Sequence, residues 1–170
     1  MCADNSLVVG IHGSESSARA LRWAVREARQ RHRAVRAVMV WSRHAVLSGP
    51  GPLLMNPELA PHHLHEQYRR ELSRTVHACV GDQLPPGLRM ELMEGRTVDV
   101  LSALSAEAAM LVLGGGHHHR GINPTTGHVV GGCLRHARCP VVIVPHDVEF
   151  APDEQERASG PASTHDPVLG

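Results

Sequence analysis

Histidine is the residue type in this sequence that is most capable of binding or transferring protons and metals, and the chain has fourteen. Three stand together as His117, His118 and His119, inside the glycine-rich segment 114–126. Imidazole is a good ligand for zinc, copper, nickel and iron. A metal site built from His12, His117 and His128 is therefore one interpretation. The other is a set of exposed polar loop residues, since consecutive side chains in a loop need not point to one centre.

Serine and cysteine supply the candidate nucleophiles. Ser14, His12 and Asp99 make up the residue inventory of a hydrolase, but the sequence contains no G-x-S-x-G nucleophile elbow. Ser14 and Ser16 are instead expected to cap the helix that follows them, by accepting a bond from a free backbone N–H. The four cysteines form no C-x-x-C pair, and we expect Cys133 and Cys139 to be buried, unreactive thiols.

The elements that must position these residues alternate between strand and helix. Short apolar runs predict strands over residues 7–11, 35–41, 88–93, 110–113 and 140–144. Helical spacing of apolar residues predicts helices over 17–31, 58–80, 97–108 and 127–136. This order indicates βαβ units and a parallel sheet, with 88–93 as an outer strand because its apolar residues alternate. Ligands of such sheets bind at the carboxyl ends of the strands, so we expect the loops after the first and fourth strands to meet at the site.

Length and composition limit the organisation and the function classes. The sequence predicts one domain over residues 1–146 and a disordered tail over 147–170, where apolar residues are too few to offset the entropy of ordering. Seventeen basic residues balance seventeen acidic ones, which gives no reason to expect nucleic acid or an anionic membrane as partner. No apolar run approaches the ~20 residues of a membrane span, and residues 1–6 do not look like a signal peptide. A cytoplasmic location is the expectation.

Two segments together carry a resemblance to a known family. One runs from Val8 through the turn 10–16 to Ala24. The other runs from Leu111 to Gly114, continues at Gly127-His128-Val129-Val130, and ends in His136-Ala-Arg-Cys-Pro-Val-Val-Ile-Val144. In this order they closely resemble the universal stress protein family, over about residues 5–146. The resemblance implies a doubly wound α/β fold, Rossmann-like and of the adenine nucleotide alpha hydrolase type, with five parallel strands in the order 3-2-1-4-5. It also implies a homodimer formed through the last strand, Val141–Val144.

Many members of that family bind ATP, and the resemblance implies that the residues at the matching positions of this chain line the same pocket. The adenosine side would be lined by Gly10, Ile11, His12, Gly13 and Val40. The phosphate side would be lined by Gly114, Gly115, Gly116, His117, His118, His119, Arg120, Gly127 and His128. Glycines let backbone amides approach phosphate oxygens, and the start of a helix favours an anion. Mg²⁺ would accompany ATP.

The match departs from the family pattern at three positions, and histidine occupies all three. His12 stands where ATP-binding relatives have Asp, His117 replaces the second glycine of the loop, and His128 replaces a Ser or Thr. Either imidazole N–H groups take over the lost contacts, or the bulk of His117 closes the loop to phosphate. We therefore expect a stress-response protein that binds ATP and has no assigned catalytic residue, hydrolysing ATP slowly at most. The alternatives are a dimeric interaction module without ATP and a histidine-based metal sensor.

Overall fold

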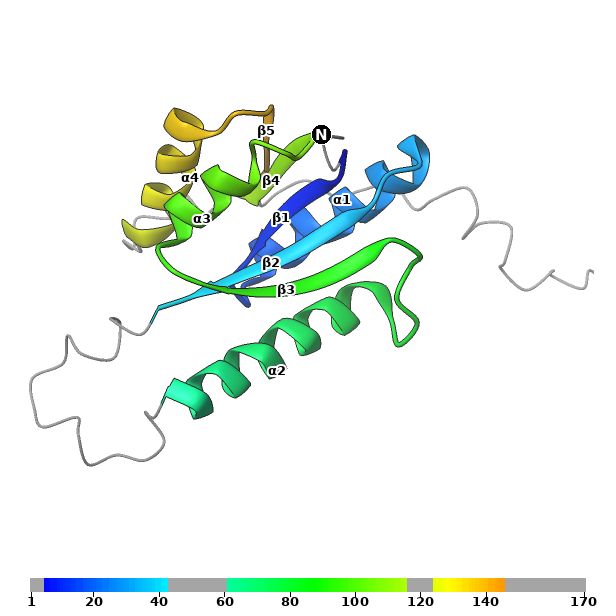
Figure 1. The fold of residues 1–170 in the computed structure, drawn as a ribbon. Coiled ribbons are helices and arrows are strands. Elements are labelled where there is room, and N and C mark those ends of the chain that lie inside the picture. The colour runs from blue at the N-terminus through cyan, green and yellow to red at the C-terminus, as the bar shows by residue number, and fades with distance from the viewer. Residues whose placement is uncertain (1–4, 43–60, 116–123, 146–170) are drawn as a thin grey trace, which may run out of the picture.

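The structure is a computed structural model, which describes residues 5–42, 61–115 and 124–145. Its centre is one parallel sheet in the order β3-β2-β1-β4-β5 (Figure 1). The strands are β1 (Leu7–Ile11), β2 (Val35–Trp41), β3 (Leu88–Glu94), β4 (Met110–Gly114) and β5 (Val141–Val144). The helices are α1 (Glu15–Arg31), α2 (Pro61–Val80), α3 (Thr97–Leu104) and α4 (Pro124–His136). The predicted fold class, strand order and outer position of β3 are confirmed.

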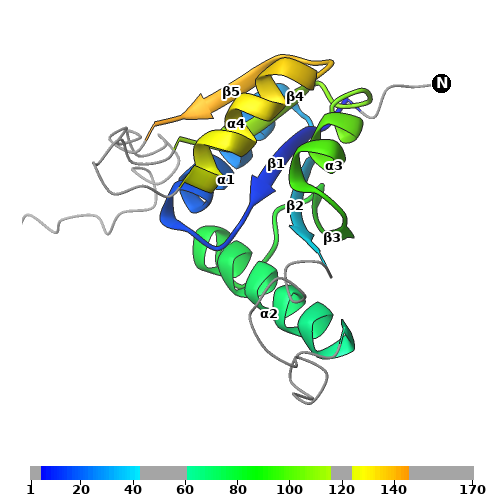
Figure 2. The same ribbon diagram turned by 90° about the vertical axis from the view of Figure 1, so that its left-hand side faces the viewer.

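Helices cover both faces of the sheet (Figure 2). Residues of alternate parity along each strand point to opposite faces, as the two-residue period of a strand requires. Leu7, Val9 and Val112 pack with α1 and α2 on one face, while Val8, Val38 and Leu111 pack with α3 and α4 on the other. Two aliphatic cores result, one on each face of the sheet.

The helix boundaries differ from the predictions at two starts and at one end, since α3 ends at Leu104 rather than at residue 108. Helix α1 begins at Glu15 because Ser14 has extended backbone angles and its hydroxyl accepts from the Ser17 N–H, so the predicted serine cap is confirmed at Ser14. Helix α4 begins at Pro124 rather than at Gly127, three residues earlier. Proline lacks an N–H and has a helical φ, so it is well suited to the first position of a helix.

The cysteines are placed largely as expected. Cys133 is fully buried in the core between the sheet and helices α3 and α4, and Cys139 is half-buried beside it. Burial raises the pKa of both thiols. Because the thiolate is the reactive form, this environment disfavours nucleophilic or redox chemistry at either residue.

A buried serine joins helix α3 to the segment before β5. The Ser105 hydroxyl donates to the Ser102 carbonyl oxygen at 2.6 Å and accepts from the Arg138 backbone N–H at 2.8 Å. The side chain of Ser105 is fully buried. The Ser105 hydroxyl therefore supplies an acceptor for the Arg138 backbone N–H, which lies in the connection between α4 and the edge strand β5.

Replacing Ser105→Ala is expected to lower the free energy of unfolding by about 1–2 kcal/mol, because the Arg138 N–H would lose its partner. Urea denaturation measures the change. Ser102→Ala is the matched control: the Ser102 hydroxyl is buried with no hydrogen-bond partner in the described part of the chain, so its removal should be neutral or stabilising. Equal losses in the two variants would contradict the assigned role of Ser105.

Within the described ranges, no helix has the length and apolar character needed to cross a membrane. The predicted tail, residues 147–170, lies outside the described residues.

Candidate functional site

The site lies where the carboxyl ends of β1 and β4 come together. These strands are direct neighbours, with Leu7 opposite Met110 and Val9 opposite Val112. The chain runs from β1 outward to β2 and β3 on one side, and returns to β4 and β5 on the other. The boundary between β1 and β4 is thus the point where strand order reverses, which is the usual ligand position in open α/β sheets. The structure brings Gly10–Gly13 and Gly114–Gly115 to this edge, so the loops after the first and fourth strands meet there, as expected.

A network of hydroxyl groups surrounds the start of α1 at this edge. The Ser14 Oγ lies 3.1 Å from His12 Nε2, 2.9 Å from Ser16 Oγ and 3.3 Å from the Ser17 N–H that it caps. The Ser17 hydroxyl donates to the Ser14 carbonyl at 2.8 Å, and the His12 N–H donates to Ser17 Oγ at 3.4 Å. Ser16 and Ser17 are buried, so the turn between β1 and α1 is held by its own polar side chains. Gly13 completes the turn with φ of +78°, a conformation that favours glycine.

A carboxylate that sequence analysis missed faces this turn. A Cβ added at Gly13 would lie 2.0 Å from the Glu71 Oε1, which places the Glu71 side chain directly against the glycine. Glu71 comes from α2 and precedes the buried Leu72. In the sequence, Glu71 stands beside an apolar position of the long helix, and nothing in its spacing predicts a contact with residue 13.

The surroundings of His12 favour its neutral form. Burial by the neighbouring side chains lowers the pKa of His12, while a hydrogen bond to its own backbone and the charge of Glu71 oppose that shift. His12 as a whole residue is nevertheless exposed to solvent. In this form the imidazole beside Ser14 provides one N–H donor and one acceptor.

The lowered pKa of His12 predicts a loss of folding stability on acidification. Below the unfolded value of about 6.5, the unfolded chain binds the proton more readily than the folded chain, so stability is fully present above this pH and falls below it. An NMR titration of the His12 ring should show a midpoint below 6.5. Glu71→Gln should lower the midpoint further, since Glu71 raises the pKa. A midpoint that rises in Glu71→Gln would contradict this assignment.

The two loop glycines of the predicted phosphate side have different surroundings. A Cβ at Gly114 would lie 2.4 Å from the Ser16 carbonyl oxygen and 2.9 Å from the Ser17 nitrogen, both backbone atoms of α1. A Cβ at Gly127 would meet no atom of the described residues within 4 Å. Gly114 is therefore glycine because β4 ends against the first turn of α1, a packing requirement that needs no ligand. Gly115 is also confined, with the Val144 carbonyl oxygen 3.1 Å from its added Cβ.

The remaining predicted residues divide between described and undescribed segments. Val40 lies on β2 and packs with the core under α3 and α4, and His128 is exposed in the first turns of α4. Residues 116–120, which include Gly116, His117 and Arg120, lie outside the described residues, and so does the proposed meeting of His12, His117 and His128. Among residues 5–42, 61–115 and 124–145, no three His, Cys, Asp or Glu side chains gather as a metal site.

Comparison with known sequences agrees with this architecture. A sequence model described as the universal stress protein family matches residues 5–145. A universal stress protein of Mycobacterium tuberculosis strain H37Rv, Rv2623, is 28% identical over 157 residues. The alignment covers 88% of this chain and 50% of that protein. The chain thus spans about half the length of the curated relatives it matches.

Solved structures share the fold at lower identity. A universal stress family protein from Burkholderia pseudomallei superposes with a TM-score of 0.60 at 23% identity, covering 85% of this chain and 98% of the other. A universal stress protein in complex with cAMP gives a TM-score of 0.53 at 23% identity, covering 82% of this chain and 95% of the other. At these identities the structures establish the shared fold.

Proposed function

This chain belongs to the universal stress protein family, and from that premise we propose that it binds an adenine nucleotide at the carboxyl ends of β1 and β4. The observation that carries the proposal is the reversal of strand order at this edge, where the Gly10–Gly13 turn, the start of α1 and Gly114–Gly115 converge. The structural neighbour in complex with cAMP supports it. The work proposed for the chain is an adaptive role in stress, exerted through the bound nucleotide.

The described residues fit the two ends of a nucleotide differently. Gly13, with its positive φ, and the polar start of α1 suit the approach of a ribose or a phosphate to backbone groups. Backbone atoms of α1 lie where a Cβ of Gly114 would be, so Gly114 permits close packing there and does not form a phosphate-binding surface. Glu71 adds a negative charge beside the turn, and its carboxylate is of the oxygen type that Mg²⁺ prefers. Mg²⁺ would therefore favour ATP at this edge, by offsetting Glu71 as well as the phosphates.

The test is calorimetric titration of the full chain, stripped of nucleotide, with ATP plus magnesium and separately with cAMP. We expect micromolar binding of at least one. His12→Asp should strengthen the binding severalfold, because it restores the carboxylate of ATP-binding relatives in place of a neutral ring. His128→Ala should weaken it, and His136→Ala, an exposed histidine at the other end of α4, is the control. No binding up to millimolar concentrations of either nucleotide would reject the proposal.

The proposal includes a homodimer formed through β5. This strand is an edge of the sheet in the described part of the chain, and the Ile143 side chain on it is 37% exposed. Leu134, on the neighbouring α4, is 55% exposed. An apolar edge strand is a ready surface for pairing with a second copy. Sedimentation of the protein and of Ile143→Lys tests this, with a dimer expected only for the unchanged chain.

The alternatives give different results in the same preparations. A chain that dimerises but binds no nucleotide would be an interaction module. A chain that copurifies with zinc, copper or nickel, and loses the metal in His12→Ala and His128→Ala, would be a metal sensor. No catalytic residue is assigned, and slow ATP hydrolysis is the most that the proposal includes.

A further inference from the structure

A groove lies at the opposite edge of the sheet from the proposed nucleotide site. It is a groove of about 460 Å³ between the last turn of α1, the starts of β2 and β3, and the connection that leads into β3. All five strands are parallel, so the amino ends of β2 and β3 lie a full strand length from the carboxyl edge. The groove is open to solvent and large enough for a small organic molecule.

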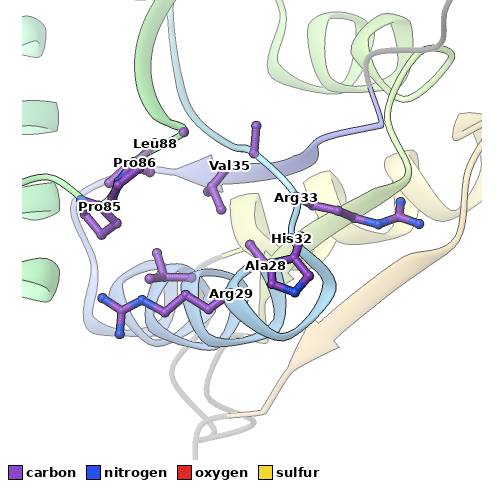
Figure 3. Close-up of a pocket in the computed structure, with 11 residues that line it drawn as sticks. Ala28, Arg29, His32, Arg33, Val35, Pro85, Pro86 and Leu88 are labelled. Carbon is purple, nitrogen blue, oxygen red and sulfur yellow. The ribbon is translucent and has the colours of Figure 1, made fainter. Parts of the chain in front are cut away.

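The floor and one wall of the groove are apolar. Ala28 of α1, Val35 of β2 and Leu88 of β3 are buried residues that form the floor. Pro85 and Pro86 form the wall, and neither has a backbone N–H (Figure 3). The surrounding backbone is already bonded, since Val35 N–H donates to the Gly87 carbonyl and Leu88 N–H to the Pro85 carbonyl. An occupant would thus meet an apolar surface without competing backbone donors.

The polar part of the groove is positive. Arg29, His32 and Arg33 line its rim, and none of the described residues that line the groove is acidic. Figure 3 shows the Arg29 and Arg33 side chains on opposite sides, with His32 between them. Arg33 bonds the neutral side chain of Asn5, so its charge is not compensated there.

Arg29 is the rim residue that is available to a ligand. Its side chain is exposed and makes no ion pair with any residue in the described ranges, whereas Arg31, two residues further along α1, pairs with Glu27. The exposed carbonyl end of a helix disfavours an anion, but here the N–H groups of His32 and Arg33 both donate to the Ala28 carbonyl. The guanidinium groups of Arg29 and Arg33 therefore give the rim a positive charge.

We propose that this groove binds a small organic anion with an apolar body and a single carboxylate, such as a free medium-chain acyl carboxylate. The carboxylate pairs with Arg29 in the two-pronged geometry that guanidinium groups favour, and the acyl chain lies on Val35 and Leu88 against the two prolines. Charge and surface are both complementary: a positive rim stands over an apolar floor. Because the groove is open, we expect the carboxylate to bind weakly.

Decanoate is the probe, titrated into the full chain and followed by calorimetry and by the NMR signals of the His32 ring. Decanoate should bind saturably and shift the His32 signals, while acetate, which lacks the apolar body, and decanol, which lacks the charge, should bind at least tenfold more weakly. Arg29→Ala should weaken decanoate binding about tenfold, and Arg29→Lys by less. The control is Arg135→Ala, an exposed arginine on α4, which should bind decanoate as the unchanged chain does.

Arg29 is on the surface, so its variants should fold, and circular dichroism verifies this. The proposal is overturned if decanoate does not saturate at millimolar concentration, if Arg29→Ala binds it equally well, or if ATP displaces it. Arg29-dependent self-association without decanoate binding would assign the groove to a second copy of the chain instead. Arg29-dependent binding to anionic vesicles alone would assign it to a membrane surface, and either result rejects the acyl carboxylate.

Discussion

Gly114→Ala is expected to lower the free energy of unfolding by about 3 kcal/mol. The new methyl group would lie 2.4 Å from the Ser16 carbonyl oxygen, and the obstacle is backbone in the first turn of α1 rather than the end of a flexible side chain. Either β4 or α1 must shift, and a shift of α1 disturbs the Ser14 cap and the core beneath it. Chemical denaturation followed by circular dichroism measures the loss.

Gly127→Ala is the matched control for that variant. Gly127 lies within helix α4, and its added Cβ would meet no atom of the described residues, so replacing the flexible glycine should raise the free energy of unfolding by about 0.5 kcal/mol. Both glycines match the family's phosphate loop, so a purely ligand-based role predicts that both variants fold normally in the absence of nucleotide. A Gly114→Ala protein as stable as the unchanged chain would contradict the packing explanation. It also follows that binding lost in a Gly114 variant would not by itself report on the nucleotide site.

Gly132→Ala is expected to lower the free energy of unfolding by about 2 kcal/mol, although alanine favours a helix. An added Cβ would lie 2.7 and 2.8 Å from the two methyl groups of Val98 on α3. Gly132 therefore permits close packing between α3 and α4. Gly131→Ala, one residue earlier, has only the Arg135 side chain at 3.7 Å and should be stabilising.

A double-mutant cycle identifies the contact behind the Gly132 effect. Val98→Ala removes the two methyl groups, so Gly132→Ala should cost much less in that background than alone. Thermal or urea unfolding of the four proteins gives the coupling energy. Additive losses would show that Gly132 is required for a reason other than its contact with Val98.

The strands were predictable from the sequence because their signal is local. Apolar runs such as Leu7–Ile11 and Met110–Gly114 occur where both faces of a strand are buried, and the alternating pattern of Leu88–Met93 marked the edge strand. The serine cap at Ser14 was likewise local, since the cap and the N–H that it binds are three residues apart.

The contacts between distant segments were not predictable in the same way. Gly114 meets Ser16, and Glu71 meets Gly13, across long stretches of chain that carry no common pattern. The glycine could be assigned to a phosphate loop or to a tight crossing of strand and helix, and only the position of α1 decides between them. The groove beside Arg29 had no signal at all, since the prolines that form its wall mark a turn when considered alone.

The position of β1 in the middle of the sheet has a consequence for synthesis of the chain. Its partner β2 begins about thirty residues after the start of β1, but its other partner, β4, begins roughly a hundred residues after the start of β1. A nascent chain emerging from the ribosome can therefore assemble β1, β2 and β3 with α1 and α2 well before α3 and α4 exist. Until α3 and α4 are synthesised, the face of this half-sheet that includes Val8 and Val38 is exposed to solvent. Aggregation or binding by a chaperone is therefore most favoured at this stage of synthesis.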